Sequence, residues 1–237
     1  MQKNLDLFMN EPDFPSSCEE EAFYSAYDKK KRIKNCDNVM HFFESRLRAA
    51  GFRDIAGVDE AGRGPLAGPV VASAVILPEG FHVEGLYDSK GISAKVREKI
   101  FSILTSREDI YWAVGVVDNF RIDSINILAA TYQAVREAYS KLSRKPEFLL
   151  NDAMIVPEIK TGQRKIIKGD AKSASIAAAS IIAKVTRDRM MDEYDRKYPA
   201  YGFIRHKGYG TAEHIEAIKK HGYCEIHRRS FNIGIEG

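Results

Sequence analysis

The stretch that most constrains the fold is IAGVDEAGRGPLAGPVVASAVIL, residues 55–77, in which two apolar runs flank a segment of acids and glycines. Residues 55–59 and 69–77 have the apolar character of strands, and the short connection between them favours antiparallel neighbours. Consecutive side chains of a strand point to opposite faces. Asp59 and Glu60 can therefore share one site only if the first strand ends there and the chain turns at Ala61–Gly64. We expect that turn, because glycine supplies the necessary backbone freedom.

The remaining chain alternates apolar strand-like runs with helical patterns. This order predicts an α/β fold in which helices pack on a mixed sheet. The longest helix is rich in alanine, and we expect its face at Ile176–Ala183 to pack on the sheet. The predicted strands are Tyr111–Val117, Phe148–Leu150 and Lys165–Ile167, and the predicted helices are Ile125–Leu142, Ser173–Lys197 and Ala212–His221.

Residues 1–52 differ from the rest and are predicted to form an N-terminal extension that is partly helical. They contain an acidic patch at residues 19–21, a basic run at residues 28–34, and a short helical pattern at residues 38–50 that Gly51 would end. We interpret the basic run as a solvated segment rather than a dedicated phosphate contact. Residues 53–237 then form the main domain, including a C-terminal helical segment from about residue 192.

Composition narrows the class of protein. The 237 residues contain no apolar stretch of the roughly 18 residues that span a bilayer, and the N-terminus lacks the pattern of a secretory signal. Three scattered cysteines match neither a disulfide framework nor a zinc site. We therefore expect a cytoplasmic monomer with no membrane contact. The net charge of +3 is too small to indicate a nucleic acid by itself.

Two further acids stand where apolar runs end, Asp152 after FLLN and Asp170 after KIIKG. Carboxylates just past buried strands are typical of functional sites in α/β sheets. If these two meet Asp59 and Glu60, four carboxylates repel one another unless cations neutralise them. Oxygen ligands favour Mg²⁺ or Mn²⁺, and a two-ion site suits phosphodiester hydrolysis. Nucleotide binding is the alternative, but neither GRGPLAG nor KGDAKS has the spacing of a phosphate loop.

Several long motifs, in order along the chain, resemble those of the ribonuclease HII family. They are DEAGRGPLAGPVV, the DSK at residues 88–90, NILAAT at 126–131, KGDAKSASIAAASIIAKVTRD, YGFIRHKGYGT and the closing HRRSF at 227–231. The resemblance runs from about residue 55 to residue 231. It implies an RNase H-like mixed five-stranded sheet and an endonuclease that cleaves the RNA strand of RNA–DNA hybrids and single ribonucleotides embedded in duplex DNA. It further implies cleavage on the 5′ side of the ribonucleotide, giving a 3′-hydroxyl and a 5′-phosphate.

The resemblance also assigns roles to individual residues. The metal-binding and catalytic acids would be Asp59, Glu60, Asp152 and Asp170, holding Mg²⁺ or Mn²⁺. Gly62, Arg63 and Gly64 would recognise the ribose 2′-hydroxyl, since glycines let the backbone approach it and arginine can hold a phosphate bidentately. Lys90 would contact the substrate, and Tyr209 would stack on the sugar beyond the RNA–DNA junction.

Two positions depart from the family pattern. Gly91 stands where a second lysine is common, so that one phosphate contact is absent or supplied elsewhere. Asn151 precedes Asp152 where the family has an apolar residue, which makes Asp152 the least secure ligand by sequence.

Other charged residues are assigned lesser roles. We expect Asp188 to pair with Lys184 or Arg187 within its helix, and His206 and His227 to be exposed rather than to contact phosphate. Candidates for a basic groove are Lys90, Lys172, Lys184, Arg187, Arg205, Lys207, Arg228 and Arg229.

Two alternative functions remain open at this point. A ribonuclease HIII-type enzyme would share the fold and a related set of acids, but it usually carries a longer N-terminal substrate-binding domain. A catalytically silent hybrid-binding protein would keep the fold alone, and the intact acids argue against it.

Overall fold

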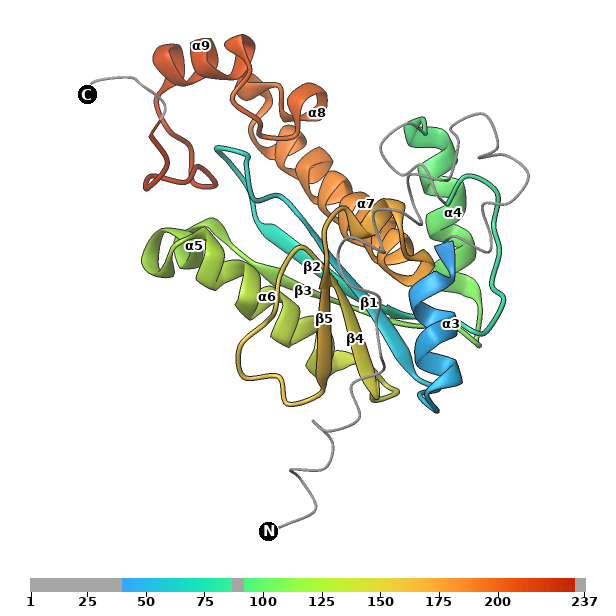
Figure 1. The fold of residues 1–237 in the computed structure, drawn as a ribbon. Coiled ribbons are helices and arrows are strands. Elements are labelled where there is room, and N and C mark those ends of the chain that lie inside the picture. Colours follow the sequence, from blue (N-terminus) through green and yellow to red (C-terminus); the bar gives the residue numbers. More distant parts are fainter. Residues whose placement is uncertain (1–39, 87–91, 233–237) are drawn as a thin grey trace.

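A mixed five-stranded sheet forms the centre of the molecule (Figure 1). The computed structural model describes residues 40–86 and 92–232. The strand order is β3-β2-β1-β4-β5, with β1 antiparallel to β2 and parallel to β4. The predicted α/β fold with a mixed five-stranded sheet is therefore confirmed. The strands are β1 (Ile55–Ala61), β2 (Val70–Ile76), β3 (Tyr111–Val117), β4 (Phe148–Asp152) and β5 (Gly162–Ile166).

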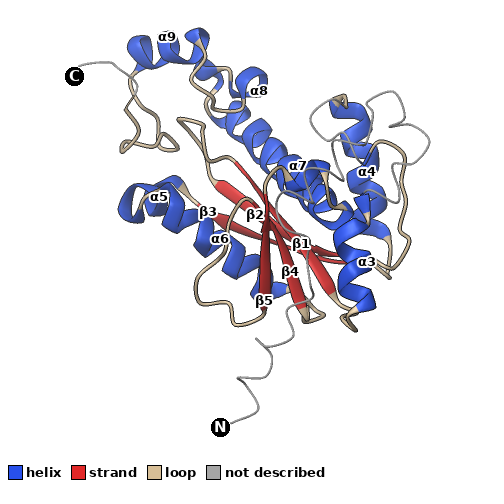
Figure 2. Cartoon of the chain, in the orientation of Figure 1, coloured by secondary structure: helices blue, strands red, loops and turns tan. Residues whose placement is uncertain are grey.

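Helices cover both faces of the sheet (Figure 2). On one face, α6 (Ile127–Lys141) packs on β2 and β3, and on the other α7 (Ala174–Lys197) packs on β1 and β2 beside α4 (Ala94–Ser106). The face of α7 at residues 176–183 is almost wholly buried, as predicted. A Cβ on Gly57 would lie 2.0 Å from the carbonyl carbon of Ser175. The backbone of α7 therefore lies directly on β1, which carries Asp59 and Glu60.

Some boundaries differ from the sequence predictions. The helix predicted at 125–142 is α6, which begins two residues later. A helix that was not predicted, α5 (Asn119–Ile125), precedes it, and Asn126 between the two has a φ of 67°. The Asn126 side chain accepts hydrogen bonds from the first amides of α6, which favours a new helix start at that residue. Helix α4 was not predicted, and the last predicted strand is β5, which begins three residues earlier and ends one residue earlier than predicted.

The described part of the N-terminal extension packs on the main domain. Helix α3 (Phe42–Ala49) buries Phe43 and Leu47 against the ends of β1, β4 and β5. The Glu44 carboxylate accepts hydrogen bonds from the hydroxyls of Ser173 and Ser175 at the start of α7. The division at residue 52 stays a prediction, but α3 belongs to the hydrophobic core.

The C-terminal segment is helical, as predicted. It contains a 3-10 turn (Pro199–Tyr201), α8 (Phe203–His206) and α9 (Ala212–His221). A separate apolar cluster, which includes Tyr201, Phe203 and Ile218, packs this segment on the end of α7 and on Ala67. In the residues described, no helix has the length and apolar character that a bilayer crossing requires.

Candidate active site

A cleft of about 450 Å³ brings together most of the residues predicted for the site. Three of the four predicted acids line it, together with the Gly-Arg-Gly turn and Tyr209. Three polar residues that the site prediction did not include, Arg97, Ser180 and Lys184, line it as well. Ser180 interrupts the alanine-rich face of α7, which was the available signal, whereas Arg97 lies on the helix that was missed. The residues lining the cleft are Asp59, Glu60, Ala61, Gly62, Arg63, Gly64, Arg97, Asp152, Ser180, Ile181, Lys184 and Tyr209.

The first strand does not end at the acids, so the expected strand end at Asp59 is wrong. Strand β1 continues to Ala61, and both acids pair with β2, Asp59 opposite Ser73 and Glu60 opposite Ala72. Pairing of β1 with β4 stops earlier, at Val58. The edge of β1 is therefore open beyond Val58, and both carboxylates reach the cleft although they belong to one continuous strand.

Burial and mutual repulsion shape the charges of the acids. Burial, followed by the charges of Glu60 and Asp152, raises the pKa of Asp59 well above its usual value, while a hydrogen bond from Ser180 acts in the opposite direction. Burial also raises the pKa of Glu60. The guanidinium of Arg63 donates to the Glu60 carboxylate at 3.1 Å and partly offsets that effect. Like charges thus accumulate at this end of the sheet.

Asp152 and Asp170 lie in adjacent elements. The amide of Gly169 donates to the Asp152 carboxylate at 2.7 Å, and Asp170 follows in the 3-10 turn Gly169–Ala171. Asp170 is buried and does not line the cleft, unlike the other three acids. The structure also explains the polar residue at position 151, where the family has an apolar one, because the Asn151 side-chain amide donates to the Gln163 side chain of β5 at 2.9 Å. Asn151 therefore faces away from the acids and leaves Asp152 at the cleft.

Two buried arginines hold the backbone of the Gly-Arg-Gly turn and of the segment that follows it, which corrects the assignment of both arginines to a basic groove. Arg228 donates to the carbonyl oxygens of Gly62, Arg63 and Gly68 at 2.5, 3.0 and 3.0 Å. Arg187 donates to Pro69, Ala67 and Lys207 at 3.0, 3.1 and 3.0 Å. Burial lowers the pKa of Arg228 to about 9. Neither guanidinium is available to a phosphate, and both instead fix the backbone beneath the cleft.

Tyr209 presents its ring at the cleft. The side chain is 46% exposed, and a Cβ on Gly64 would lie 3.6 Å from the ring. The preceding Gly208 has a φ of +85°, and a Cβ there would come within 2.5 Å of the carbonyl oxygen of Ala67. The glycine before Tyr209 is therefore required for the loop to approach the residues that follow the Gly-Arg-Gly turn.

The remaining predicted charges are distributed as follows. Lys184 pairs with Asp188 at 2.7 Å, as predicted, and Lys184 also lines the cleft. His206 and His227 are buried, so the expectation that they are exposed is wrong. Lys90 and Gly91 lie outside the described residues. Of the other groove candidates, Arg205 pairs with Glu213, Lys207 pairs with Asp192, Lys172 is half-buried and Arg229 is exposed.

The ligand atoms available in the cleft are of the type that binds a hard divalent cation. Asp59, Glu60 and Asp152 offer only carboxylate oxygens, and a cation would relieve the repulsion that raises the pKa of Asp59. Within the described ranges, no three His, Cys, Asp or Glu side chains already converge as a metal-binding group. Glu60 instead shares its carboxylate with Arg63.

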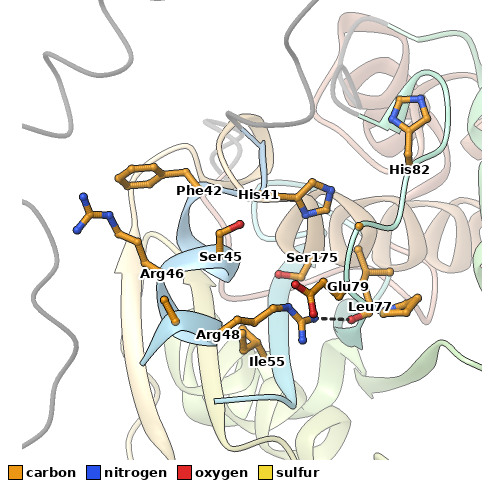
Figure 3. A pocket seen from close by; sticks show the side chains of 13 residues that line it. His41, Phe42, Ser45, Arg46, Arg48, Ile55, Leu77, Glu79, His82 and Ser175 are labelled. Atoms are coloured by element: carbon orange, nitrogen blue, oxygen red, sulfur yellow. Dashed lines mark hydrogen bonds between the residues drawn. The ribbon is translucent and has the colours of Figure 1, made fainter. Parts of the chain in front are cut away.

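A second cavity, of about 650 Å³, lies between α3 and the segment after β2 (Figure 3). His41, Arg48 and Glu79 are among its lining residues, and Arg48 donates to the Leu77 carbonyl at 3.2 Å. None of the residues predicted for the site lines this cavity. The smaller cleft is therefore the candidate active site, because it holds the acids.

A mixed five-stranded sheet with helices on both faces, and carboxylates at the ends of the adjacent strands β1 and β4, defines a nuclease of the RNase H-like class. The family model described as Ribonuclease HII matches residues 56–233. The ribonuclease HII of Acetivibrio thermocellus is 54% identical over 209 residues, which cover 86% of this chain and 81% of the relative. The chain belongs to the ribonuclease HII family and is a type 2 ribonuclease H, an endonuclease that acts on RNA–DNA hybrids.

Solved structures agree with this assignment. The ribonuclease H2 of Pyrococcus horikoshii has a TM-score of 0.63 and 33% identity, covering 76% of this chain and 94% of its own. The RNase HII of Archaeoglobus fulgidus, solved in complex with PCNA, has a TM-score of 0.60 and 25% identity, covering 78% and 98%. Bst-RNase HIII in complex with Mn²⁺ is 20% identical with a TM-score of 0.53, covering 73% and 64%, and shows likeness of fold alone. The HIII alternative therefore has no support beyond the shared fold.

Proposed function

We propose that this enzyme cleaves both RNA–DNA hybrids and duplex DNA that contains a single ribonucleotide, on the 5′ side of the ribonucleotide, with a 3′-hydroxyl and a 5′-phosphate as products. The observation that carries the proposal is the shared cleft of Asp59, Glu60 and Asp152 with the Gly-Arg-Gly turn and Tyr209. Acids, a backbone turn suited to a 2′-hydroxyl, and an exposed aromatic ring are the three groups that such a reaction needs in one place.

Asp59, Glu60 and Asp152 would hold Mg²⁺ or Mn²⁺, with Asp170 beside them in the adjoining turn. The bound cation supplies charge neutralisation and an activated water for phosphodiester hydrolysis. A related protein, Bst-RNase HIII, was solved in complex with Mn²⁺, which supports a divalent ion of this kind. The raised pKa of Asp59 supports it too, since crowded carboxylates are stabilised by a cation.

The chain's own residues would orient the substrate. Arg228 holds the carbonyl groups of Gly62 and Arg63, so the peptide planes of the turn are fixed before the substrate arrives. A fixed backbone can discriminate a 2′-hydroxyl from a hydrogen without a reorganisation cost. The Tyr209 ring, beside Gly64, would pack on the sugar of the following nucleotide and detect the change from RNA to DNA.

The test is product mapping on two substrates, a uniform RNA–DNA hybrid and a DNA duplex with one central ribonucleotide. We expect cleavage of both with Mg²⁺ or Mn²⁺ and none with EDTA, and a single cut 5′ to the ribonucleotide in the second. Product ends are identified by ligation and by phosphatase treatment. Cleavage 3′ to the ribonucleotide, or cleavage unaffected by EDTA, would refute the proposal, and binding without cleavage would indicate the catalytically silent alternative.

A further inference from the structure

Three buried histidines lie directly behind Tyr209. His206 belongs to α8, His214 to α9, and His227 to the closing segment that pairs with Ala67. Their exposed fractions are 7%, 0% and 1%, and the rings of His206 and His214 stack with centroids 4.4 Å apart. Neither the family resemblance nor the proposed chemistry assigns them a role. Their burial calls for an explanation, because a buried histidine requires partners for both ring nitrogens.

Backbone groups determine which nitrogen of each ring carries the proton. The amide of Cys224 can only donate, and it lies 2.9 Å from Nδ1 of His227, nearer than the Cys224 carbonyl at 3.3 Å. The Cys224 thiol, which can also donate, lies 3.0 Å from the same nitrogen. His227 therefore carries its proton on Nε2 and donates to Nε2 of His214 at 3.1 Å. His214 then carries its proton on Nδ1 and donates to the carbonyl oxygen of Tyr209, which can only accept, at 2.9 Å. These hydrogen bonds all run in one direction, from Cys224 through His227 and His214 to Tyr209, and both rings are uncharged.

His206 supports the same loop from the other side. The amide of Gly208 donates to Nδ1 of His206 at 3.2 Å, and the amide of Tyr209 donates to the His206 carbonyl at 2.9 Å. Nε2 of His206 consequently carries the proton and donates to the Tyr201 carbonyl at 2.9 Å. The Tyr209 amide is thus held by the backbone carbonyl of His206, and the Tyr209 carbonyl by the His214 ring together with the Thr211 amide at 2.8 Å, while the Tyr209 side chain lines the cleft.

We propose that the hydrogen-bonded pair of His227 and His214, with His206 on the other side of the loop, is a positioning device for Tyr209, which holds the backbone so that the ring faces the nucleotide beyond the cleavage site. The inference rests on the proposed role of Tyr209 in substrate binding. A ring that packs on a sugar must be held at one height and tilt, and an exposed loop alone would not supply that order. The histidines act through Tyr209 and do not touch the substrate.

The surroundings keep the rings of His227 and His214 uncharged at neutral pH. Burial, followed by the neighbouring His214, lowers the pKa of His227 to about 4, and burial lowers the pKa of His214. The other titratable or charged groups that face His227 are His206, Cys224, Arg229, Tyr201 and Tyr223. None is a carboxylate that would favour the imidazolium. Protonation of His214 would set its Nε2–H against Nε2–H of His227, and protonation of His227 would set its Nδ1–H against the Cys224 amide, so either change would break one hydrogen bond of the series.

The test is a double-mutant cycle on the DNA duplex with one ribonucleotide, measured as duplex affinity in EDTA and as kcat/KM with Mg²⁺. His214→Leu removes the side-chain donor to the Tyr209 carbonyl and leaves the Thr211 amide, whereas His214→Asn retains a side-chain donor at the position of Nδ1. We expect His214→Leu to weaken both quantities about fivefold to twentyfold, the effect of losing a buried hydrogen bond, and His214→Asn to recover most of that loss. In a Tyr209→Ala background, His214→Leu should add less than about a twofold loss, because nothing remains to be positioned.

Losses that multiply in the double variant, or equal losses for His214→Asn and His214→Leu, would overturn the inference. His221→Gln is the matched control, since His221 is exposed on the same helix. Thermal unfolding of each variant shows whether it is folded. If Tyr209→Ala changes neither quantity, the proposed role of Tyr209 fails and the inference fails with it. If cleavage is absent but the affinity cycle is non-additive, the proposed chemistry fails while the positioning role stands.

Discussion

Replacing Asp59 by asparagine separates the contribution of the acids to chemistry from their cost to the fold. The Asp59 carboxylate is buried, and the charges of Glu60 and Asp152 raise its pKa further. Asparagine has nearly the same shape without the charge, and it can still accept the 2.7 Å hydrogen bond from the amide of Glu60. We therefore expect Asp59→Asn to abolish cleavage and, without metal, to make the protein more stable.

The magnitude follows from burial and repulsion, which act in the same direction. A buried polar group that lacks full compensation costs on the order of 1–3 kcal/mol, so the free energy of unfolding should rise by that order in EDTA when the Asp59 charge is removed. For a chain of this size that is roughly a 2–12 °C rise in Tm. A divalent cation at a hundred times its Kd should stabilise the wild type by about 2.7 kcal/mol, and the variant by clearly less because one ligand is lost.

The assay is thermal and urea unfolding of both proteins in EDTA and across a series of Mg²⁺ or Mn²⁺ concentrations. Asp109→Asn is the matched control, because Asp109 is an exposed carboxylate that pairs with Arg107 at 2.5 Å and does not line the cleft. This control should leave the response to metal unchanged. The reasoning is refuted if Asp59→Asn is less stable than the wild type in EDTA, or if metal stabilises both proteins equally.

Four further outcomes are expected. Tyr209→Phe should keep most activity on a single embedded ribonucleotide, whereas Tyr209→Ala should lose about 1–3 kcal/mol of binding, as for aromatic stacking in nucleic-acid complexes; equal losses would implicate the hydroxyl. Phe43→Ala should cost about 3–5 kcal/mol of stability, because the ring is wholly buried, and urea unfolding measures this. Arg228→Lys should lower both stability and cleavage of the single-ribonucleotide duplex, because a lysine cannot reach the carbonyls of Gly62, Arg63 and Gly68 together; unchanged cleavage would contradict the role assigned to the turn. His227 should make the protein acid-sensitive, because its pKa of about 4 in the folded protein lies below the value near 6.5 in the unfolded chain. The stability present above about pH 6.5 should therefore fall by about 3 kcal/mol as the pH drops to about 4. His227→Gln should flatten that part of the profile of stability against pH.

The strands and the long helix could be predicted from the sequence because their signals are local. Residues 111–117 form β3 as predicted, and the alanine-rich helix predicted at Ser173–Lys197 is α7. Ser173 is its N-cap, and its side chain accepts a hydrogen bond from the amide of Ile176. The break at Asn126 could not be predicted in this way. The predicted helix began at Ile125 and α5 was not predicted, and it is the positive φ of Asn126 that separates α5 from α6.

The same distinction holds for the site. Asp59, Glu60 and Asp152 could be chosen because acids at the ends of apolar runs are conspicuous in a sequence. Their meeting in one cleft depends on where pairing between β1 and β4 stops, which no local pattern records. Arg97 and Ser180 were missed as site residues for the same reason, since each reaches the cleft from a helix packed on one face of the sheet.

The sequence by itself determined the class of fold, the family and the kinds of chemical group available, because periodicity and motifs are properties of neighbouring residues. Only the tertiary structure decided which charges face a substrate. Arg187 and Arg228 belong to apparently basic motifs, yet both are buried and donate their hydrogen bonds to backbone carbonyls. His206 and His227 stand in equally polar stretches, yet both lie inside the C-terminal segment. Burial depends on contacts between residues far apart in the chain. Because of those contacts, charged and polar residues that the sequence places in surface-like motifs are buried and hold the backbone beneath the cleft.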